Sequence, residues 1–287
     1  MFNMLKMDLY KMFHLRSLYV IWIIMSAFIL LSIYLLKQDY DMIEVDLDQG
    51  TISKETADEE ADEDGVEVEV GLVVSLPDDV NNKVTLYDLI FANTGGNTVA
   101  LFLVIFAVML TMADFGNGYI KNIAGQVPDR GMLVIAKMCS LFIYTILTFV
   151  LYVIMSIIGS LLVFSYLEPG NIKELLIYLG VQVMLHFALA VICMTVSYVT
   201  KNTVISMTIS ICIVINFMTI IYDLLDIIIN KFTKNNFEII KYTVTGNISL
   251  LQMNPTGGEV CTALVSALAF VTFMTFISYH VFRRRDI

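Results

Sequence analysis

The residues of this chain that could do chemistry are few, and they do not form a catalytic pattern. The three histidines, at positions 14, 186 and 280, lack the close spacing of a zinc site. The sequence contains no phosphate-binding loop, no His-Glu-x-x-His metalloprotease motif and no Gly-x-Ser-x-Gly nucleophile elbow. We therefore predict that the chain is not an enzyme and that it binds no metal or cofactor itself.

Some polar residues lie in or beside apolar segments. His186 is the one ionisable residue deep inside such a segment, and intramembrane polar groups are candidate functional sites because hydrocarbon solvates them poorly. We interpret it as a neutral imidazole hydrogen-bonded to a neighbouring helix, with a substrate contact or proton relay as the alternative. Asp223 and Asp226 are interpreted as a helix cap or an interfacial pair. The four cysteines fall in different apolar runs and are interpreted as small buried hydrophobes.

The most organised polar stretch runs from Ala113 to Lys137. Residues 119–124 can form about two turns of helix, and Gly125 can end them. Pro128 cannot continue a helix, whereas Asp129 can N-cap the next one. We expect a short surface helix that inserts into a groove of a partner; a loop that only reverses the chain is the alternative.

The elements that must position these residues are membrane helices. The chain has 287 residues, of which 58% are hydrophobic, and its mean hydropathy is +0.79. Soluble domains are usually about 45–50% apolar. Several runs of about 20 apolar residues predict an all-α membrane protein with six transmembrane helices. The net charge of −10 does not favour nucleic acid as a partner.

The expected order starts with an amphipathic interfacial helix at residues 1–17. The six spans are expected at residues 18–36, 97–113, 132–164, 172–199, 203–222 and 260–282. The segments between them are an acidic extracellular segment at 37–97, the polar loop at 114–131, an extracellular amphipathic or re-entrant segment at 223–259, and a tail at 283–287. Within the acidic segment, Val66–Val70 alternates with period two and suggests short strands, while Thr85–Thr94 suggests an interfacial helix on the outer side.

Basic residues set the expected orientation. With six spans, the span ends that face one side of the membrane carry most of the basic residues: Lys6, Lys11, Arg16, Lys121, Arg130, Lys137, Lys201 and positions 283–285. Because lysine and arginine near span ends remain in the cytoplasm, both termini and the polar loop are expected there. The acidic segment is then outside, where we expect a solvated surface, with a sampling surface for cationic ligands as the alternative.

Several motifs carry a family resemblance. Gly118-Tyr-Ile-Lys-Asn-Ile, followed by Pro128-Asp-Arg130 and then Lys137, resembles the first cytoplasmic loop of type-2 ATP-binding-cassette (ABC) permeases. The opening Leu5–Lys11 and the closing Phe282–Ile287 are similar to the termini of that family. Bacitracin- and lantibiotic-immunity-type permeases look nearest in size. The chain departs from the family at three positions. The family often has Glu where this chain has Asp114, Thr where it has Tyr119, and Ser or Thr where it has Asp129.

The resemblance implies a permease subunit that exports an amphipathic substrate, such as a peptide antibiotic, a peptide or a lipid-like molecule. It implies a coupling helix that docks on a separate ATPase, made of Tyr119, Ile120, Lys121, Asn122, Ile123 and Ala124. Asp114, Asp129, Arg130 and Lys137 would support this helix.

The resemblance also implies the partners. Two ATPase copies would hold the ATP and Mg, a second permease would complete a homo- or heterodimer, and lipid of a bacterial plasma membrane would surround it. The alternatives are a non-transporting membrane sensor or binding module that uses the acidic segment, and an ATP-independent ion carrier.

Overall fold

The computed structural model describes residues 2–48, 83–116, 131–233 and 238–283. Within these ranges every regular element is a helix, and no strand occurs. The segment Val66–Val70, for which short strands were expected, and the loop at 117–130 lie outside the described residues. The all-α fold predicted from the apolar runs is therefore confirmed for the described part of the chain.

Among the described residues, five helices are long and apolar enough to cross a membrane. These segments are Arg16–Gln38 of α2 (Arg16–Asp48), Thr98–Phe115 of α5 (Thr98–Gly116), Gly131–Phe164 formed by α7 (Gly131–Gly159) and the π-helix η1 (Ser160–Phe164), α8 (Ile172–Thr200), and α12 (Gly257–Arg283). A sixth crossing requires α9 (Thr203–Val214) and α10 (Thr219–Thr233) to act as one broken span, because they meet at a bend of 60°.

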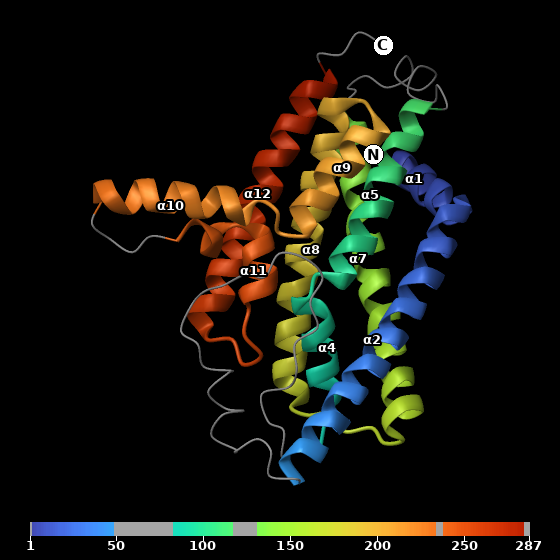
Figure 1. Cartoon of the computed structure of the whole chain (residues 1–287). Coiled ribbons are helices and arrows are strands. Elements are labelled where there is room, and N and C mark those ends of the chain that lie inside the picture. The colour runs from blue at the N-terminus through green and yellow to red at the C-terminus, as the bar shows by residue number, and fades with distance from the viewer. Residues whose placement is uncertain (1, 49–82, 117–130, 234–237, 284–287) are drawn as a thin grey trace.

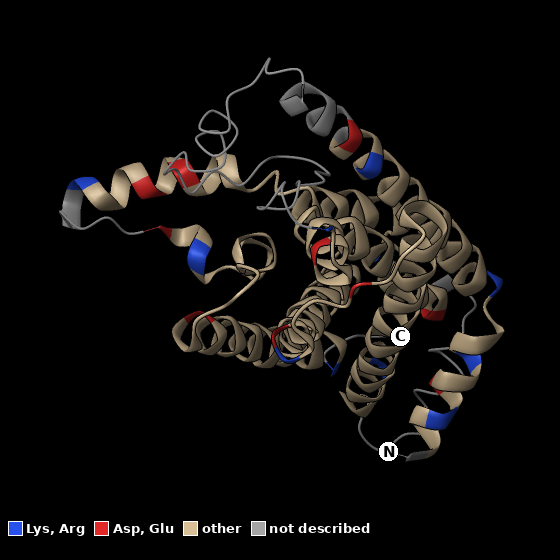
Figure 2. Ribbon diagram, turned by 90° about the horizontal axis from the view of Figure 1, so that it is seen from below, with Lys and Arg blue, Asp and Glu red and all other residues tan. Residues whose placement is uncertain are grey.

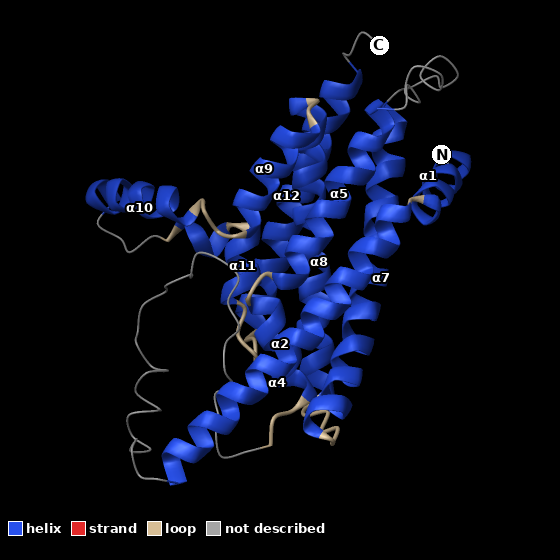
Figure 3. Cartoon of the chain, turned by 45° about the vertical axis from the view of Figure 1, so that its right-hand side comes forward, coloured by secondary structure: helices blue, strands red, loops and turns tan. Residues whose placement is uncertain are grey.

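Helix α8 is the centre of the bundle. It packs against α5, α7, α9 and α12, and also against the short helix α11 (Val244–Leu250). Every residue from Leu185 to Thr195 in α8 is buried, as expected for a helix enclosed on all sides. Figures 1 and 3 show α2, α5, α7, α8 and α12 running roughly side by side along the long axis of the molecule.

One end of the bundle gathers the features that orientation depends on. Figure 1 places the N-terminal helix α1 (Phe2–His14), the end of α5 and the C-terminal end of α12 at the top. The far end of α2 and the start of α8 lie at the bottom. In the end-on view of Figure 2, the bundle helices are mostly free of charge, while Lys, Arg, Asp and Glu mark α1 and α10. The end of α5 and the start of α7, which flank residues 117–130 in the sequence, therefore lie at the end that carries α1.

The segment expected to form an outer interfacial helix is instead buried inside the bundle. It forms α4 (Leu86–Gly95), which begins at a capping box between Thr85 and Asp88. The hydroxyl of Tyr152 in α7 donates to the backbone oxygen of Ile90 at 2.7 Å. Helix α4 also packs against α5 and α7, which bury its apolar residues. It therefore lies inside the bundle rather than on its surface.

Two helix breaks occur at asparagines: one lies at the expected start of the span at 97–113, and the other interrupts the expected span at 203–222. Asn97 separates α4 from α5 with φ of 56°, and Asn216 separates α9 from α10 with φ of 55°. Both are in the left-handed region, which asparagine enters more readily than most residues because its short side chain can hydrogen-bond locally. The expected span at 203–222 therefore ends early, at Val214.

Helix α10 matches the amphipathic character expected for the segment that follows. It extends away from the bundle, nearly across the other helices (Figures 1 and 3). Its apolar residues Leu224, Ile227 and Ile228 are exposed. The carboxylate of Asp226 accepts a hydrogen bond from the backbone N–H of Ile239, at the start of the 3-10 helix η2 (Ile239–Tyr242). Asp226 lies inside α10 and binds the first residue of η2, whereas a cap at the end of a span or an interfacial pair was expected.

Candidate functional site

Four charged side chains from three helices meet near the α1 end of the bundle, and we call them the charge cluster: Asp8 and Lys11 of α1, Asp114 of α5 and Lys137 of α7. The Lys137 Nζ lies 2.9 Å from Asp114 Oδ2 and 3.1 Å from Asp8 Oδ1. Lys11 pairs with the other carboxylate oxygen of Asp114. The cluster therefore joins α1 to the two helices that flank the loop at 117–130.

Local sequence explains why these side chains converge. Asp8 and Lys11 are three residues apart in α1, so they lie on neighbouring positions of one helix surface. The same helix packs along α7 and buries Met12 completely. Asp114 is in the last turn of α5, next to the point where the chain enters the loop. Each helix thus presents its charge toward a common point.

Three members of the cluster are buried, Lys11 is partly buried, and the charges balance. Lys137 is 1% exposed, Asp8 4% and Asp114 6%, and two carboxylates face two ammonium groups. Burial raises the pKa of the Asp8 carboxyl above its usual value, although the nearby Lys137 ammonium opposes the shift. An ion pair taken out of water stays charged only when its geometry is good and each partner remains in place. The arrangement is suited to holding three helices together rather than to catalysis.

The structure brings together two of the four residues expected to support the coupling loop, Asp114 and Lys137. Asp129 and Arg130 lie outside the described residues, as do the six positions expected to form the coupling helix, Tyr119 to Ala124. The sequence analysis missed the role of Asp8. The available signal was that it is the one acidic residue among the first sixteen, in an otherwise basic leader.

His186 lies in the middle of α8, 0% exposed. Its Nδ1 is 2.9 Å from the backbone oxygen of Gln182 in its own helix, not from a neighbouring helix as expected. A carbonyl oxygen only accepts, so Nδ1 carries the proton and Nε2 is left as an acceptor. No partner for Nε2 occurs among the described residues. The ring of Phe149 packs edge-on against the imidazole, with centroids 4.9 Å apart.

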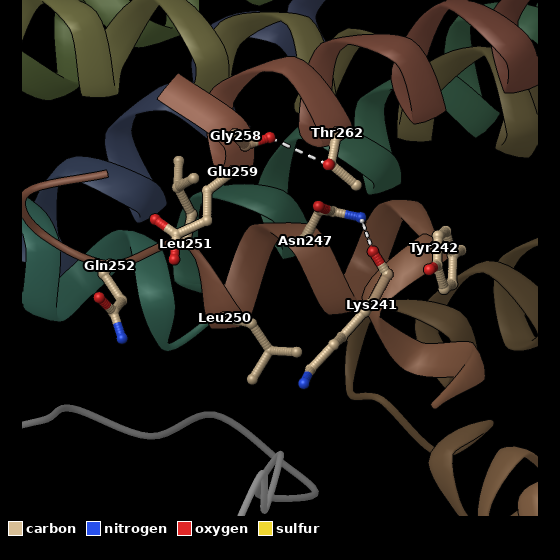
Figure 4. Close-up of a pocket in the computed structure, with 9 residues that line it drawn as sticks. All are labelled: Lys241, Tyr242, Asn247, Leu250, Leu251, Gln252, Gly258, Glu259 and Thr262. Carbon is tan, nitrogen blue, oxygen red and sulfur yellow. Dashed lines mark hydrogen bonds between the residues drawn. The ribbon is translucent and has the colours of Figure 1, made fainter. Parts of the chain in front are cut away.

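A separate cavity of about 500 Å³ opens between η2, α11 and the start of α12 (Figure 4). Its lining mixes apolar, amide and charged side chains: Lys241, Tyr242, Asn247, Leu250, Leu251, Gln252, Gly258, Glu259 and Thr262. The Asn247 amide donates to the backbone oxygen of Lys241 at 2.8 Å, which fixes one wall. The sequence analysis named none of these as a site. In the described ranges, no group of three or more His, Cys, Asp or Glu could hold a metal ion.

Five membrane-length apolar helices among the described residues indicate that the chain is a multi-pass membrane protein. A family model described as a protein of unknown function, DUF2705, matches residues 73–287, and the chain belongs to this family. The matched region includes Asp114 and Lys137 but not α1, which supplies Asp8 and Lys11. No curated protein matches the chain.

Proposed function

We propose that the chain is the permease subunit of an ABC exporter, driven by ATP that a separate ATPase subunit hydrolyses. The observation that carries the proposal is the charge cluster. It braces α1, the end of α5 and the first turns of α7 against one another, directly beside the loop in which a coupling helix is expected. The chain itself would hydrolyse nothing, and Mg and ATP would bind only to the partner.

The cluster gives a physical route for force. A partner that moves the loop moves the end of α5 and the start of α7 together, because Lys137 bridges Asp114 and Asp8. Helix α1 follows through the pairs of Asp8 and Lys11. Its exposed Tyr10 and Phe13 suit insertion among lipid headgroups, so α1 would slide along the inner surface as the bundle tilts.

The same proposal assigns the orientation and the assembly. The end that carries α1, Lys201 and Arg283 faces the cytoplasm of a bacterial plasma membrane, because basic residues near span ends favour that side. Two ATPase copies dock there, one on each of two permease subunits. The substrate is amphipathic, a peptide antibiotic, another peptide or a lipid-like molecule, in keeping with the resemblance to bacitracin- and lantibiotic-immunity-type permeases.

The test is to purify the tagged chain from its native membranes and to reconstitute it with any ABC ATPase encoded by a neighbouring gene. We expect the two to co-purify and the chain to stimulate ATP hydrolysis. Ile120→Asp and Lys121→Glu should abolish the stimulation. Lys173→Glu is the control, because Lys173 is an exposed lysine at the start of α8, at the opposite end of the bundle from α1. The proposal fails if no ATPase binds, or if the loop variants stimulate hydrolysis as well as the control.

An ATP-independent ion carrier is a second candidate, favoured by one observation. Among the described residues, four buried amide side chains have carbonyl oxygens without partners, and three of them, Asn97, Gln182 and Asn216, are held by α11, as described below. Ion flux through proteoliposomes that contain the chain alone, without nucleotide, would support the carrier and count against the exporter.

A further inference from the structure

Three primary amides from different parts of the fold end on one short helix, α11. Asn97, at the break between α4 and α5, and Asn216, at the break between α9 and α10, each place Nδ2 at 3.2 Å from Ser249 Oγ. Gln182 of α8 donates from Nε2 to the backbone oxygen of Ile248 at 3.1 Å. The amides of Asn97 and Asn216 therefore lie within two hydrogen-bond lengths of each other, and that of Gln182 is bound to the adjacent residue.

Each of these amides leaves its carbonyl oxygen without a partner. Asn97 is 3% exposed, Asn216 2% and Gln182 0%, and no donor among the described residues reaches Asn97 Oδ1, Asn216 Oδ1 or Gln182 Oε1. Leaving a buried acceptor unpaired costs about 1–3 kcal/mol each. Such a concentration of unpaired acceptors in one region of a membrane bundle calls for something that satisfies them.

The orientations of the amides follow from their partners. The backbone oxygen of Ile248 accepts only, so the nitrogen of Gln182 must face it and the carbonyl must point elsewhere. The Ser249 hydroxyl has a single proton, so it can satisfy at most one of the two asparagine carbonyls in any arrangement. At least two carbonyl oxygens thus remain free whichever way the asparagines are turned.

The backbone at this place is also unusual. Asn97 and Asn216 both adopt left-handed conformations at helix breaks inside the bundle. Irregular backbone at membrane depth is tolerated where it is buried in protein or lines a site, and broken helices often provide substrate or ion ligands there. Sparsely populated backbone conformations concentrate at functional sites. Two such breaks meeting at one serine point to a site rather than to packing alone.

We propose that the carbonyl oxygens of Asn97, Gln182 and Asn216 bind a monovalent cation inside the membrane, either a metal ion or the primary ammonium group of a substrate. Neutral carbonyl oxygens replace the hydration shell of monovalent ions. Calcium and magnesium sites usually include carboxylates, and none of these three ligands is acidic. An anion would require donors, whereas the free atoms are acceptors. Ser249 is a positioning residue, because it holds two of the amides by their nitrogens.

The test uses the purified full-length chain, with no ATPase and no nucleotide, so its outcome is independent of the proposed export function. Thermal unfolding is measured at constant chloride in sodium, potassium, methylammonium or N-methyl-D-glucamine, the last being too bulky for the site. We expect one of the first three cations to raise Tm saturably, by about 3–5 °C at ten times its Kd. Sodium or potassium would identify an ion site, and methylammonium alone a substrate ammonium site.

Glycine substitutions provide matched variants. Asn216→Gly and Asn97→Gly remove the carbonyl but keep a residue that accepts the left-handed backbone, and Gln182→Leu removes the third ligand. Ser165→Gly is the control, because Ser165 is also left-handed, with φ of 61°, but is exposed far from α11 in the sequence. The cation-dependent shift should disappear in the first three and persist in the control.

The proposal is overturned if no cation raises Tm above the value in N-methyl-D-glucamine, since the amides would then hold water only. It is equally overturned if Asn216→Gly and Gln182→Leu keep the full shift. Where a variant does not fold, equilibrium binding of radioactive sodium, potassium or methylammonium to the wild type gives the same answer: saturable binding of one of them supports the site, and the absence of binding of all three contradicts it.

Discussion

Replacing Lys137 by methionine tests the charge cluster most sharply. Methionine is unbranched and apolar, so it retains most of the volume and shape of the lysine stem while removing the ammonium. In the wild type this group contacts Asp114 at 2.9 Å and Asp8 at 3.1 Å. After the change, Asp114 keeps its pair with Lys11, whereas Asp8 loses the one ion pair it makes in the described structure.

The expected loss of stability follows from this asymmetry. Removing one partner of a buried ion pair costs about 3–5 kcal/mol, because the other charge is left buried and unpaired. Only Asp8 is stranded, so we expect a single penalty of this size rather than two. At about 2–4 °C per kcal/mol for a chain of this length, Tm should fall by roughly 10 °C.

The assay is thermal unfolding of the purified chain in lipid nanodiscs. Lys6→Met is the matched control, because Lys6 is on the same helix as Asp8 but exposed, and its loss should change stability by less than about 0.5 kcal/mol. Adding Asp8→Asn to Lys137→Met should recover most of the loss, since both buried charges are then gone. The reasoning is refuted if Lys137→Met unfolds at the same temperature as Lys6→Met, or if Asp8→Asn brings no recovery.

Three further changes follow from the structure. Burial raises the pKa of the Asp8 carboxyl above 3.8, so the folded chain binds a proton there more tightly than the unfolded chain does. Stability should therefore fall as pH rises from 3.8 through the raised pKa. Asp8→Asn should flatten this slope of Tm against pH. Tyr152→Phe removes the bond to Ile90 that holds α4 and should cost about 1–2 kcal/mol in the free energy of unfolding; a fall below 0.3 kcal/mol would contradict this role. Gly131→Ala would make its Cβ clash with the Tyr279 ring, so it should cost about 1–3 kcal/mol in the free energy of unfolding, and less in a Tyr279→Ala background. Equal costs in the two backgrounds would disprove the contact.

The membrane helices were predictable because the physical requirement is local. About 20 apolar residues span hydrocarbon whatever they pack against, so α2, α5, α7, α8 and α12 follow from hydropathy alone. The break between α9 and α10 was not predicted, because the sequence there gives little local signal. Between Val214 and Thr219 the chain has no glycine or proline, and the one polar signal was Asn216, whose partner Ser249 is 33 residues further on.

The candidate site was predictable only in part, since ion pairing depends on tertiary structure. Asp114 and Lys137 were identified only through the family resemblance of the loop and its flanking residues. Their link to Asp8, which is 129 residues from Lys137, could not be inferred from spacing. In α8, His186 received attention because it is ionisable, while Gln182, one turn earlier, is polar in the same apolar run and makes the contact with α11.

The central claim is that the bundle end carrying the charge cluster receives an ATPase. The most direct measurement is photo-crosslinking in membranes, with a photoreactive amino acid at Ile120 or at Leu167. Leu167 is 43% exposed and follows η1, at the end of the bundle opposite the charge cluster. We predict a crosslink from position 120 to an ABC ATPase subunit, and none from position 167. A crosslink from position 167 alone, or none from either position in cells that contain both proteins, would contradict it.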